Sequence, residues 1–374
     1  MTSSSLEPLT RKSWEPDIGL KLTGAERRRE RQFLRSYGDC FAFSMADLGR
    51  LKGPGIRIDL AIDAPIFRRP YRYSDMERAL IQSRCQDILG AGLVEKSYGE
   101  YASATVMPAK KDMHGNYTDR RMCGDYRPIN QQTKSDRYAM PTPEEIFDAI
   151  GHAKVFISLD LRAGYHQLPI RLEDRQKTAF WGINPFGKDC LYQWKFLPFG
   201  LKNAPAEFQR VMDKILAGLD FARCYIDDIV VYSDSVEEHQ KHLKEVFERL
   251  MAHGLKLHPG KCKFFQEQIE YLGHTIYPGG LGVQQTKVEA NRRIPRPTDV
   301  SRVRAFMGLA NYYRRYVKGF SALAKPLTLL TKSDQQWIWG DDQERAFEEL
   351  KDRLSSAPIL RRPIRGRPFQ LHTD

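Results

Sequence analysis

Paired cysteines are the first feature that the sequence lacks. None of its six cysteines forms a Cys-x-x-Cys pair or a Cys/His spacing suited to binding a metal ion. With 374 residues the chain can bury a sizeable core without disulfides or a structural zinc ion. We therefore interpret the cysteines as reduced, mostly buried residues of an intracellular protein: Cys40, Cys85, Cys123, Cys190, Cys224 and Cys262.

Long hydrophobic runs are missing as well. The sequence has no stretch of about 18 apolar residues, which a membrane-spanning helix requires. The N-terminus, MTSSSLEPLTRKSWEPD, is polar and does not have the apolar core of a secretion signal. We therefore expect no membrane partner.

Basic residues, in contrast, are in excess. The chain has 59 Lys and Arg against 47 Asp and Glu, a net charge of +12 and a pI near 9.3. Basic clusters occur at Arg27–Arg31, Arg68–Arg72 and Arg361–Arg367. A dispersed positive charge suits a long groove along a nucleic-acid duplex better than a small pocket.

Two adjacent acids interrupt an apolar stretch at residues 221–234, FARCYIDDIVVYSD. The pattern predicts a β-hairpin whose tip carries Asp227 and Asp228. Two carboxylates about 4 Å apart repel by roughly 1 kcal/mol in water and about 4 kcal/mol near a protein surface. A bound cation would relieve this cost, whereas the alternative is a solvated Asp-Asp turn.

A third acid ends another strand-like segment, KVFISLDL at residues 154–161. Its alternation places Asp160 on the face opposite Val155, Ile157 and Leu159. The two segments can lie side by side in one antiparallel sheet and bring three carboxylates to one edge. Carboxylates at one site suit Mg²⁺, and two such ions can activate a hydroxyl and stabilise a leaving pyrophosphate.

Five ordered blocks together carry a family resemblance, and they are RMCGDYRPIN (121–130), SLDLRAGYHQLPI (158–170), LPFGLKNAPAEFQ (197–209), YIDDIVVYS (225–233) and YLGHTI (271–276). In their order and spacing they resemble the reverse transcriptase of gypsy-class LTR retrotransposons. The resemblance implies an α+β fold shaped like a right hand, with fingers, a ferredoxin-like palm and a helical thumb. It also implies an RNA-directed DNA polymerase, cut from a polyprotein, that works in the cytoplasm or a virus-like particle, with the nucleus as an alternative.

The same resemblance assigns the chemistry to the three acids. Asp160, Asp227 and Asp228 would be the catalytic and metal-binding residues, holding two Mg²⁺ ions that Mn²⁺ can replace. The expected partners are an RNA or DNA template-primer and deoxynucleoside triphosphates. Tyr165 would exclude the ribose 2′-hydroxyl, although a tyrosine after a strand is equally a packing residue.

Further contacts with the nucleotide and the primer follow from the resemblance. Lys110 and Arg121 would touch the triphosphate, where the alternative is two solvent-facing charges of a hairpin. Lys261 would lie near the triphosphate, and Phe199 with Gly200 would lie beneath the nucleotide and template base. The turn of a later hairpin would grip the primer through Leu272, Gly273 and His274. Asp125 and Arg127 are expected to pair with each other.

Domain boundaries are expected at three places. Residues 1–50 are a lead-in or linker, 51–280 form fingers and palm, 281–340 form the thumb, and 341–374 begin a truncated ribonuclease H-like domain. Asp374 would be the first metal ligand of that last domain. One acid cannot form a two-metal nuclease, so we expect no ribonuclease H activity.

Local signals predict several helices. Capping boxes at Ser74/Glu77 and at Thr142/Glu145 predict helices near 75–90 and up to about 149. Asn203 is the expected N-cap of the following long helix, and Ser235 and Asp299 are those of two later ones. In the helix after Ser235 we expect Met251 to face inward and His239 and His242 to face solvent.

Two other functions compete with a polymerase. A decayed or domesticated fragment would bind nucleic acid without extending a primer. A Mg²⁺-dependent nuclease is disfavoured because it has no use for a sugar-excluding tyrosine or basic fingers.

Overall fold

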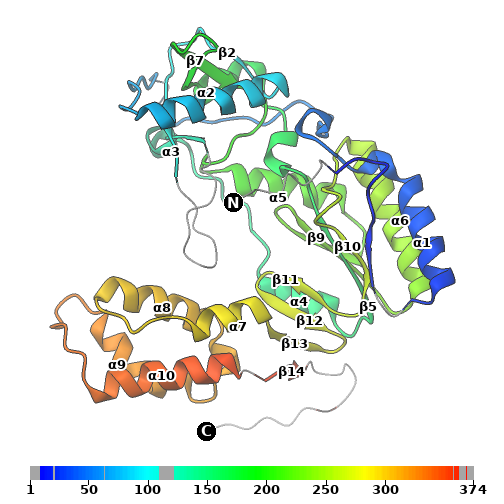
Figure 1. Cartoon of the computed structure of the whole chain (residues 1–374), viewed down its shortest axis with the longest axis vertical. Helices are drawn as coiled ribbons and strands as arrows, with labels where there is room; N and C mark the ends of the chain where they lie inside the picture. The colour runs from blue at the N-terminus through cyan, green and yellow to red at the C-terminus, as the bar shows by residue number, and fades with distance from the viewer. Residues whose placement is uncertain are drawn as a thin grey trace, which may run out of the picture. The chain divides into compact units, whose positions relative to one another are not determined.

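The computed structural model describes residues 9–19, 22–62, 64–108, 122–356, 358–361 and 368. Lys110, Arg121 and Asp374 therefore lie outside the described residues. The chain divides into two compact units, Met1–Ile146 with Phe156–Gln266, and Phe147–Val155 with Glu267–Asp374. Figure 1 labels many of the elements of each unit.

A five-stranded sheet forms the centre of the first unit. In spatial order its strands are β1 (Asp17–Ile18), β10 (Lys263–Gln266), β5 (Val155–Asp160), β9 (Asp228–Ser233) and β8 (Ala222–Tyr225). β1 pairs parallel with β10, whereas β10 with β5 and β8 with β9 are antiparallel. Without β1, the chain order β-α-β-β-α-β and the spatial order β10-β5-β9-β8 are those of a ferredoxin-like fold, which confirms the predicted palm.

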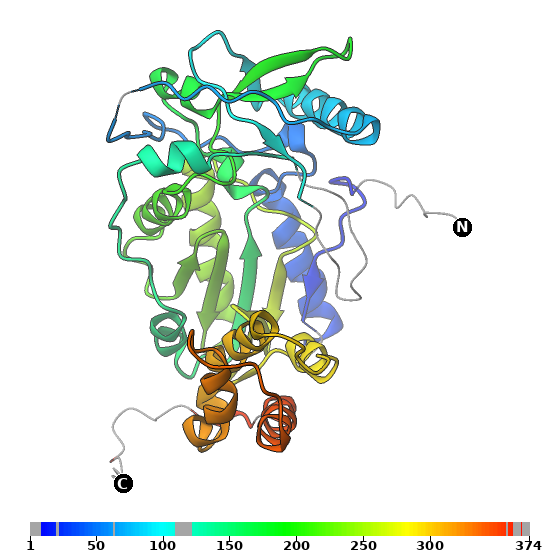
Figure 2. The ribbon, with the colours of Figure 1, turned by 90° about the vertical axis from the view of Figure 1, so that its left-hand side faces the viewer.

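Two helices connect the strands of this sheet. They are α5 (Ala204–Ile215), which precedes β8, and α6 (Val236–His253), which follows β9. Phe208 and Met212 of α5 and Leu243 and Phe247 of α6 are fully buried. Figure 2 shows the strands in front of α6.

The predicted caps of these helices have different outcomes. The Ser235 hydroxyl accepts a hydrogen bond from the Glu238 N–H, and Gly254, at φ +79°, ends α6. Asn203 is the N-cap residue of α5, as predicted, but its side chain makes no capping bond. Its amide instead donates to the Lys134 carbonyl at 2.7 Å and accepts from the Asp136 N–H at 3.1 Å.

Two further predictions for α6 are wrong. Met251 is 40% exposed rather than buried. His239 is fully buried rather than solvated. Its Nδ1 and that of His242 each form a hydrogen bond with Ser233 Oγ at 2.7 Å, so these ring nitrogens have polar partners inside the protein. His242 also stacks on the ring of Phe221.

The N-terminal segment belongs to the palm rather than to a linker. Trp14 is 2% exposed, and its indole N–H donates to the Pro259 carbonyl at 3.0 Å. The Trp14 ring lies 4.4 Å from that of Phe41, measured between centroids. This packing holds the chain where β1 adds the edge strand.

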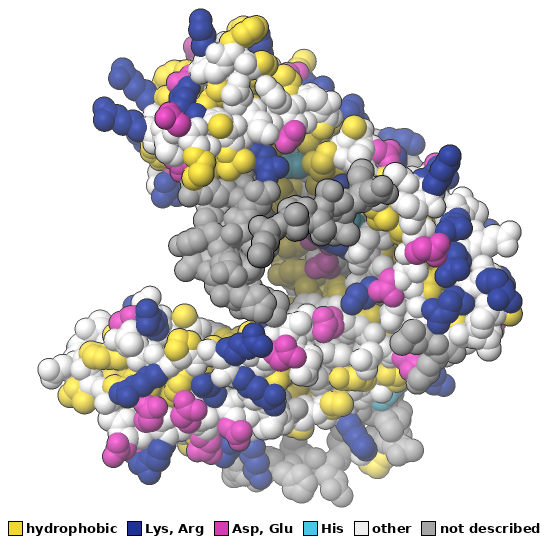
Figure 3. Space-filling view, in the orientation of Figure 1, with side chains coloured by type: hydrophobic (Ala, Val, Ile, Leu, Met, Phe, Trp, Pro, Cys, Tyr) yellow, Lys and Arg dark blue, Asp and Glu magenta, His cyan; other side chains and the backbone are white. Residues whose placement is uncertain are grey.

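Helix α1 (Gly24–Ser36) uses much of the first basic cluster for internal contacts. Arg27 donates to the carbonyls of Ile18 and Gly19 at 2.8 and 2.7 Å. Arg31 pairs with Glu15 at 3.0 Å. Figure 3 shows basic side chains interleaved with acidic ones over this part of the surface. The expectation that the cluster at 27–31 lines a nucleic-acid groove is therefore not supported by its contacts.

The remaining elements of the first unit correspond to the fingers and their connections. A three-stranded sheet has the order β2 (Val94–Lys96), β7 (Asp189–Trp194), β6 (Phe180–Ile183), and β3 (Thr105–Val106) pairs with β4 (Cys123–Gly124). The helices are α2 (Asp75–Gly90), α3 (Arg127–Gln132) and the 3-10 turns η1 (Gly38–Cys40), η2 (Met45–Asp47), η3 (Gly164–Gln167) and η4 (Leu172–Thr178). The predicted capping box of Ser74 and Glu77 is present at the start of α2.

The second unit joins a small sheet to a group of helices. Its strands are β11 (Ile269–Tyr271), β12 (His274–Tyr277), β13 (Gly280–Val283) and β14 (Leu360–Arg361). Its helices are α7 (Gln285–Arg292), α8 (Val300–Tyr312), the 3-10 turn η5 (Arg314–Tyr316), α9 (Phe320–Leu330) and α10 (Asp341–Ser355). Helix α4 (Pro143–Ile150) begins in the first unit and ends in the second, after the predicted Thr142/Glu145 box.

Helices α8, α9 and α10 share one core. Val303, Leu327, Phe347 and Leu350 are all fully buried within it. The expected boundary at residue 341 is therefore wrong, because α10 packs with the thumb helices instead of starting another domain. Asp299 caps α8 as predicted, accepting from the Arg302 N–H at 2.9 Å.

All six cysteines are free thiols. Among the described residues, no helix combines the length and hydropathy that crossing a membrane demands.

Candidate active site

The predicted hairpin positions two acids at its tip. Tyr225 at the end of β8 pairs with Asp228 at the start of β9, so Ile226 and Asp227 form a two-residue loop. Ile226 has φ +57°, which is an unusual backbone conformation for a β-branched residue. A positive φ at the first loop position is typical of a type II′ turn.

Asp160 meets this tip because β5 and β9 are neighbours in the sheet. The Leu161 N–H, one residue beyond Asp160, donates to the Asp227 carbonyl at 3.2 Å. Gly164 packs against the same tip, since a Cβ there would lie 3.2 Å from the Asp227 Cβ. The sequence-based expectation that the two segments converge is met by this geometry.

The three carboxylates share a poorly solvated region. Burial raises the pKa values of Asp160 and Asp227, while Lys261 lowers both, its Nζ lying 3.5 Å from Asp160 Oδ2. Burial, and then the charges of Asp227 and Asp160, raise the pKa of Asp228 to about 6. Each shift means that ionised carboxylates are costly here, so a divalent cation would be favoured.

The donor set fits metal ions only in part. Among the described residues, no three His, Cys, Asp or Glu side chains are grouped closely enough to hold one ion by themselves. The assignment of Asp160, Asp227 and Asp228 as the metal-binding residues stays a prediction. Mg²⁺ needs only one or two protein carboxylates when water and substrate phosphates supply the other ligands, and these acids can provide that number.

Tyr165 and Phe199 lie together beside the acids. The Tyr165 ring is 5.4 Å from that of Phe199 and 5.3 Å from that of Phe208. Burial, and then the charge of Asp227, raises the pKa of Tyr165 to about 12. Phe199 is 45% exposed, and the following Gly200 has φ +93°, a conformation suited to glycine. An apolar surface therefore adjoins the acidic tip.

Residues 109–276 match the family described as reverse transcriptase (RNA-dependent DNA polymerase). The chain is 36% identical over 319 residues to the retrovirus-related Pol polyprotein from transposon 297 of Drosophila melanogaster, covering 83% of this chain and 29% of that protein. It is 34% identical over 326 residues to the Pol polyprotein from transposon gypsy of the same organism, covering 83% and 31%. This chain belongs to the gypsy-class LTR retrotransposon reverse transcriptases.

Solved reverse transcriptases share the fold. The foamy viral protease-reverse transcriptase in complex with double-stranded DNA aligns with a TM-score of 0.81 at 25% identity, covering 93% of this chain and 71% of that one. The same viral protein in complex with an RNA/DNA hybrid aligns with a TM-score of 0.79 at 24% identity, covering 91% and 45%. The present chain spans about a third or less of the length of the curated relatives named above.

The residues predicted to grip the primer lie in the second unit. Leu272 and Gly273 form a two-residue loop in which both φ values are positive, as in a type I′ turn. The hydroxyls of Tyr312 and Tyr313 donate to the carbonyls of Leu272 and Gly273, each at 2.7 Å. These two hydrogen bonds hold the loop in place, with its backbone positioned to make contacts.

His274 does not fit its predicted role. Its side chain is 1% exposed, and its ring lies 4.9 Å from that of Phe147 and 5.3 Å from those of Tyr312 and Tyr313. Such burial leaves the imidazole no surface with which to contact a primer. We therefore correct the assignment of His274 from a primer contact to a core residue.

A basic pocket of about 400 Å³ lies on the fingers. Its lining includes Arg68, Arg69 and Tyr71 together with Asp125 and Arg127. The predicted pair is present, since Arg127 donates to both carboxylate oxygens of Asp125 at 2.7 Å. This pairing lowers the pKa of Asp125 to about 2.

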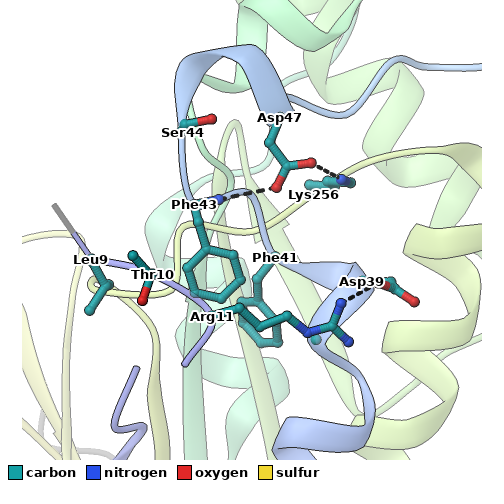
Figure 4. Close-up of a pocket in the computed structure, with 10 residues that line it drawn as sticks. Leu9, Thr10, Arg11, Asp39, Phe41, Phe43, Ser44, Asp47 and Lys256 are labelled. Carbon is teal, nitrogen blue, oxygen red and sulfur yellow. Dashed lines mark hydrogen bonds and ion pairs between the residues drawn. The ribbon is translucent and has the colours of Figure 1, made fainter. Parts of the chain in front are cut away.

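A second cavity of about 390 Å³ lies where the N-terminal segment meets residues 38–47 (Figure 4). Its charged groups already have partners, because Arg11 pairs with Asp39 at 2.7 Å and Lys256 with Asp47 at 2.5 Å. This cavity is therefore not a second charged site.

Sequence reasoning missed Gln209. It is fully buried on α5, between the apolar residues Phe208 and Met212, and it hydrogen bonds to the β8–β9 hairpin. A polar residue within the apolar stripe of a predicted helix was the available signal.

Proposed function

We propose that this chain is an RNA-directed DNA polymerase that extends a primer on an RNA or DNA template. One observation supports this proposal most directly. Asp160 ends β5 and Asp227 lies in the loop just before the neighbouring strand β9, and the Leu161–Asp227 hydrogen bond joins the two places although the acids are 67 positions apart in sequence (227 − 160). Membership of the reverse transcriptase family supports the same reaction.

Two Mg²⁺ ions, or Mn²⁺ in their place, would be held by Asp160 and Asp227, with Asp228 beside them. When bound, the ions lower the cost of forming the attacking 3′-alkoxide and the leaving pyrophosphate. Lys261, next to Asp160, adds positive charge where the triphosphate would be. Lys110 and Arg121 remain predictions for the same role.

The Tyr165 ring would form the wall against which the sugar packs. It is held from two sides by Phe199 and Phe208, so it cannot easily retreat from a 2′-hydroxyl. This arrangement would favour deoxynucleoside triphosphates. The half-exposed Phe199 would support the base.

Template-primer binding would be mainly electrostatic. The net charge of +12 and the exposed Arg68 and Arg69 favour phosphate contacts. The related foamy viral protein has been solved with double-stranded DNA and with an RNA/DNA hybrid. We place the enzyme inside the cell, in the cytoplasm or a virus-like particle, with the nucleus as an alternative.

Primer extension tests this function directly. The chain is incubated with poly(rA)/oligo(dT), thymidine triphosphate and Mg²⁺ or Mn²⁺, and products are resolved by length. We expect extension that stops when the metal is chelated. Tight duplex binding with no extension under either metal would favour the alternative, a fragment that binds nucleic acid without polymerising.

A further inference from the structure

The catalytic hairpin carries an unfavourable backbone conformation directly before its metal ligand. Ile226 has φ +57°, and Asp227 follows it. Any residue with a Cβ is strained there, and a β-branched one especially so. Such a conformation persists only where the surrounding structure holds it.

Gln209 of α5 supplies that hold. Its Oε1 accepts from the Ile226 N–H at 2.7 Å, and its Nε2 donates to the Cys224 carbonyl at 3.0 Å. The side chain is fully buried, so water does not compete for these groups. One amide therefore bonds the hairpin on both sides of Tyr225.

Asp213, one turn further along α5, fixes which way this amide faces. Its Oδ1 accepts from Gln209 Nε2 at 2.8 Å. A carboxylate can only accept, so the NH₂ group must point toward it and the oxygen must point toward Ile226. A flipped amide would set two oxygens against each other.

Tyr138 completes the chain of contacts. Its hydroxyl donates to Asp213 Oδ2 at 2.5 Å, and its ring carries the Arg210 guanidinium 4.8 Å from the centroid. Arg210 pairs in turn with Asp136 at 2.7 Å. The segment around residue 136 is thereby connected to the hairpin through side chains alone.

We propose that Gln209, oriented by Asp213 and Tyr138, is a positioning residue that holds Ile226 and so places the Asp227 carboxylate for metal binding. This inference rests on the proposed role of Asp227 as a metal ligand. Loss of the amide should weaken metal binding while leaving the phosphate contacts with the duplex intact. Partners that orient metal ligands typically change metal affinity by about 10- to 100-fold when removed.

The test compares Gln209→Met with wild type. Methionine fills a similar volume but makes none of the three hydrogen bonds. Mn²⁺ affinity is measured by electron paramagnetic resonance, and the Mg²⁺ dependence of single-turnover extension is measured at saturating nucleotide. We expect affinity to fall about tenfold or more, with duplex affinity within about twofold of wild type. Gln240→Met on α6 is the matched control and should change neither measurement.

A second variant separates positioning from general packing. Glycine accepts a positive φ without strain, so Ile226→Gly added to Gln209→Met should recover part of the lost Mn²⁺ affinity, about threefold or more. A residue that only packed would show no such rescue. If Gln209→Met does not fold, Asp213→Asn and Tyr138→Phe replace it and should each weaken Mn²⁺ binding, by less than the about tenfold expected for Gln209→Met because they act on the hairpin only through Gln209.

Wild-type Mn²⁺ affinity in Gln209→Met, or in both substitute variants, would overturn the proposal. The proposed function fails separately, if wild type binds duplex but never extends a primer. Because Mn²⁺ affinity is measured without catalysis, the positioning role is tested in either case.

Discussion

The main-chain N–H of Leu161 donates to the carbonyl of Asp227 across 3.2 Å, which ties the end of β5 to the tip of the β8–β9 hairpin. The Asp160 carbonyl is fixed as well, accepting from the His258 N–H at 2.8 Å. The backbone of both acids is therefore set by bonds to other segments.

Sugar selection should depend on the size of residue 165. In Tyr165→Val the ring packed on Phe199 and Phe208 is lost, and space opens for a 2′-hydroxyl. We expect the preference for deoxyribonucleotides to fall by about 10- to 100-fold, the scale on which pocket size discriminates between substrates. The ratio of kcat/KM for dTTP and UTP measures it. Tyr98→Val, at an 89% exposed position, is the control; an unchanged ratio in Tyr165→Val would remove the assignment.

The N-terminal segment should be needed for stability. Trp14→Ala deletes a buried ring and its hydrogen bond to Pro259. We expect the free energy of unfolding to fall by about 3–5 kcal/mol, measured by urea unfolding followed by circular dichroism. Phe186→Ala, at an 86% exposed position, should cost less than about 0.5 kcal/mol. Equal stability of the two variants would mean that residues 9–19 are not part of the palm in solution.

Duplex binding should weaken as the salt concentration rises. This salt dependence should come from basic residues of the fingers rather than from those of α1. Arg68 and Arg69 are exposed and line the basic pocket, whereas Arg31 and Arg35 pair with Glu15. Arg68→Ala with Arg69→Ala should reduce the slope of log K against log salt by about 1–2. Arg31→Ala with Arg35→Ala should leave the slope unchanged. The opposite pattern would place the nucleic acid on the α1 face.

Lowering the pH should destabilise the fold, because the buried side chain of His166 resists protonation in the folded chain. His166 is stacked on Trp194, its Nδ1 lies 3.0 Å from the Leu197 carbonyl, and burial lowers its pKa from 6.5 to about 4. Between those values the unfolded chain binds more protons than the folded one, so stability present at pH 7 is lost as pH falls from 6.5 toward 4. The loss attributable to this group is at most roughly 3 kcal/mol.

His166→Asn keeps an N–H donor but cannot take up a proton. Urea unfolding across this pH range should show a shallower loss of stability than in wild type. Part of the loss of stability at low pH should remain in His166→Asn, because burial also lowers the pKa of His239, to about 3. His152→Asn, at an exposed position, is the control, and its stability should depend on pH as that of wild type does. A profile in His166→Asn as steep as that of wild type would contradict this explanation.

Local patterns predicted much of the fold and the central acids. The alternation in 154–161 placed Asp160 at the end of a strand, and the split apolar run in 221–234 placed Asp227 at the tip of a hairpin, because such patterns depend only on neighbouring residues. The Ser74/Glu77 and Ser235/Glu238 signals worked for the same reason, since their bonds span three positions.

What the sequence did not predict depends on distant partners. His274 is buried because Phe147 and Tyr312 surround it, and neither is a neighbour in sequence. β1 is only two residues long and pairs with a strand some 246 positions later (263 − 17). Two residues are too few to show the alternating pattern from which a strand is predicted. The role of Gln209 lies in two tertiary hydrogen bonds to the β8–β9 hairpin, which the spacing of residues in the sequence does not indicate.

The most direct test of the account replaces one carboxylate. Single-turnover primer extension is measured for wild type, Asp227→Asn and Asp220→Asn, with duplex affinity determined in parallel. Asp220 is an exposed acid just before β8 and serves as the control. We predict that Asp227→Asn loses at least about a hundredfold in rate with duplex affinity unchanged, while Asp220→Asn behaves as wild type. Extension by Asp227→Asn at the wild-type rate would contradict the claim that this hairpin holds the catalytic metal.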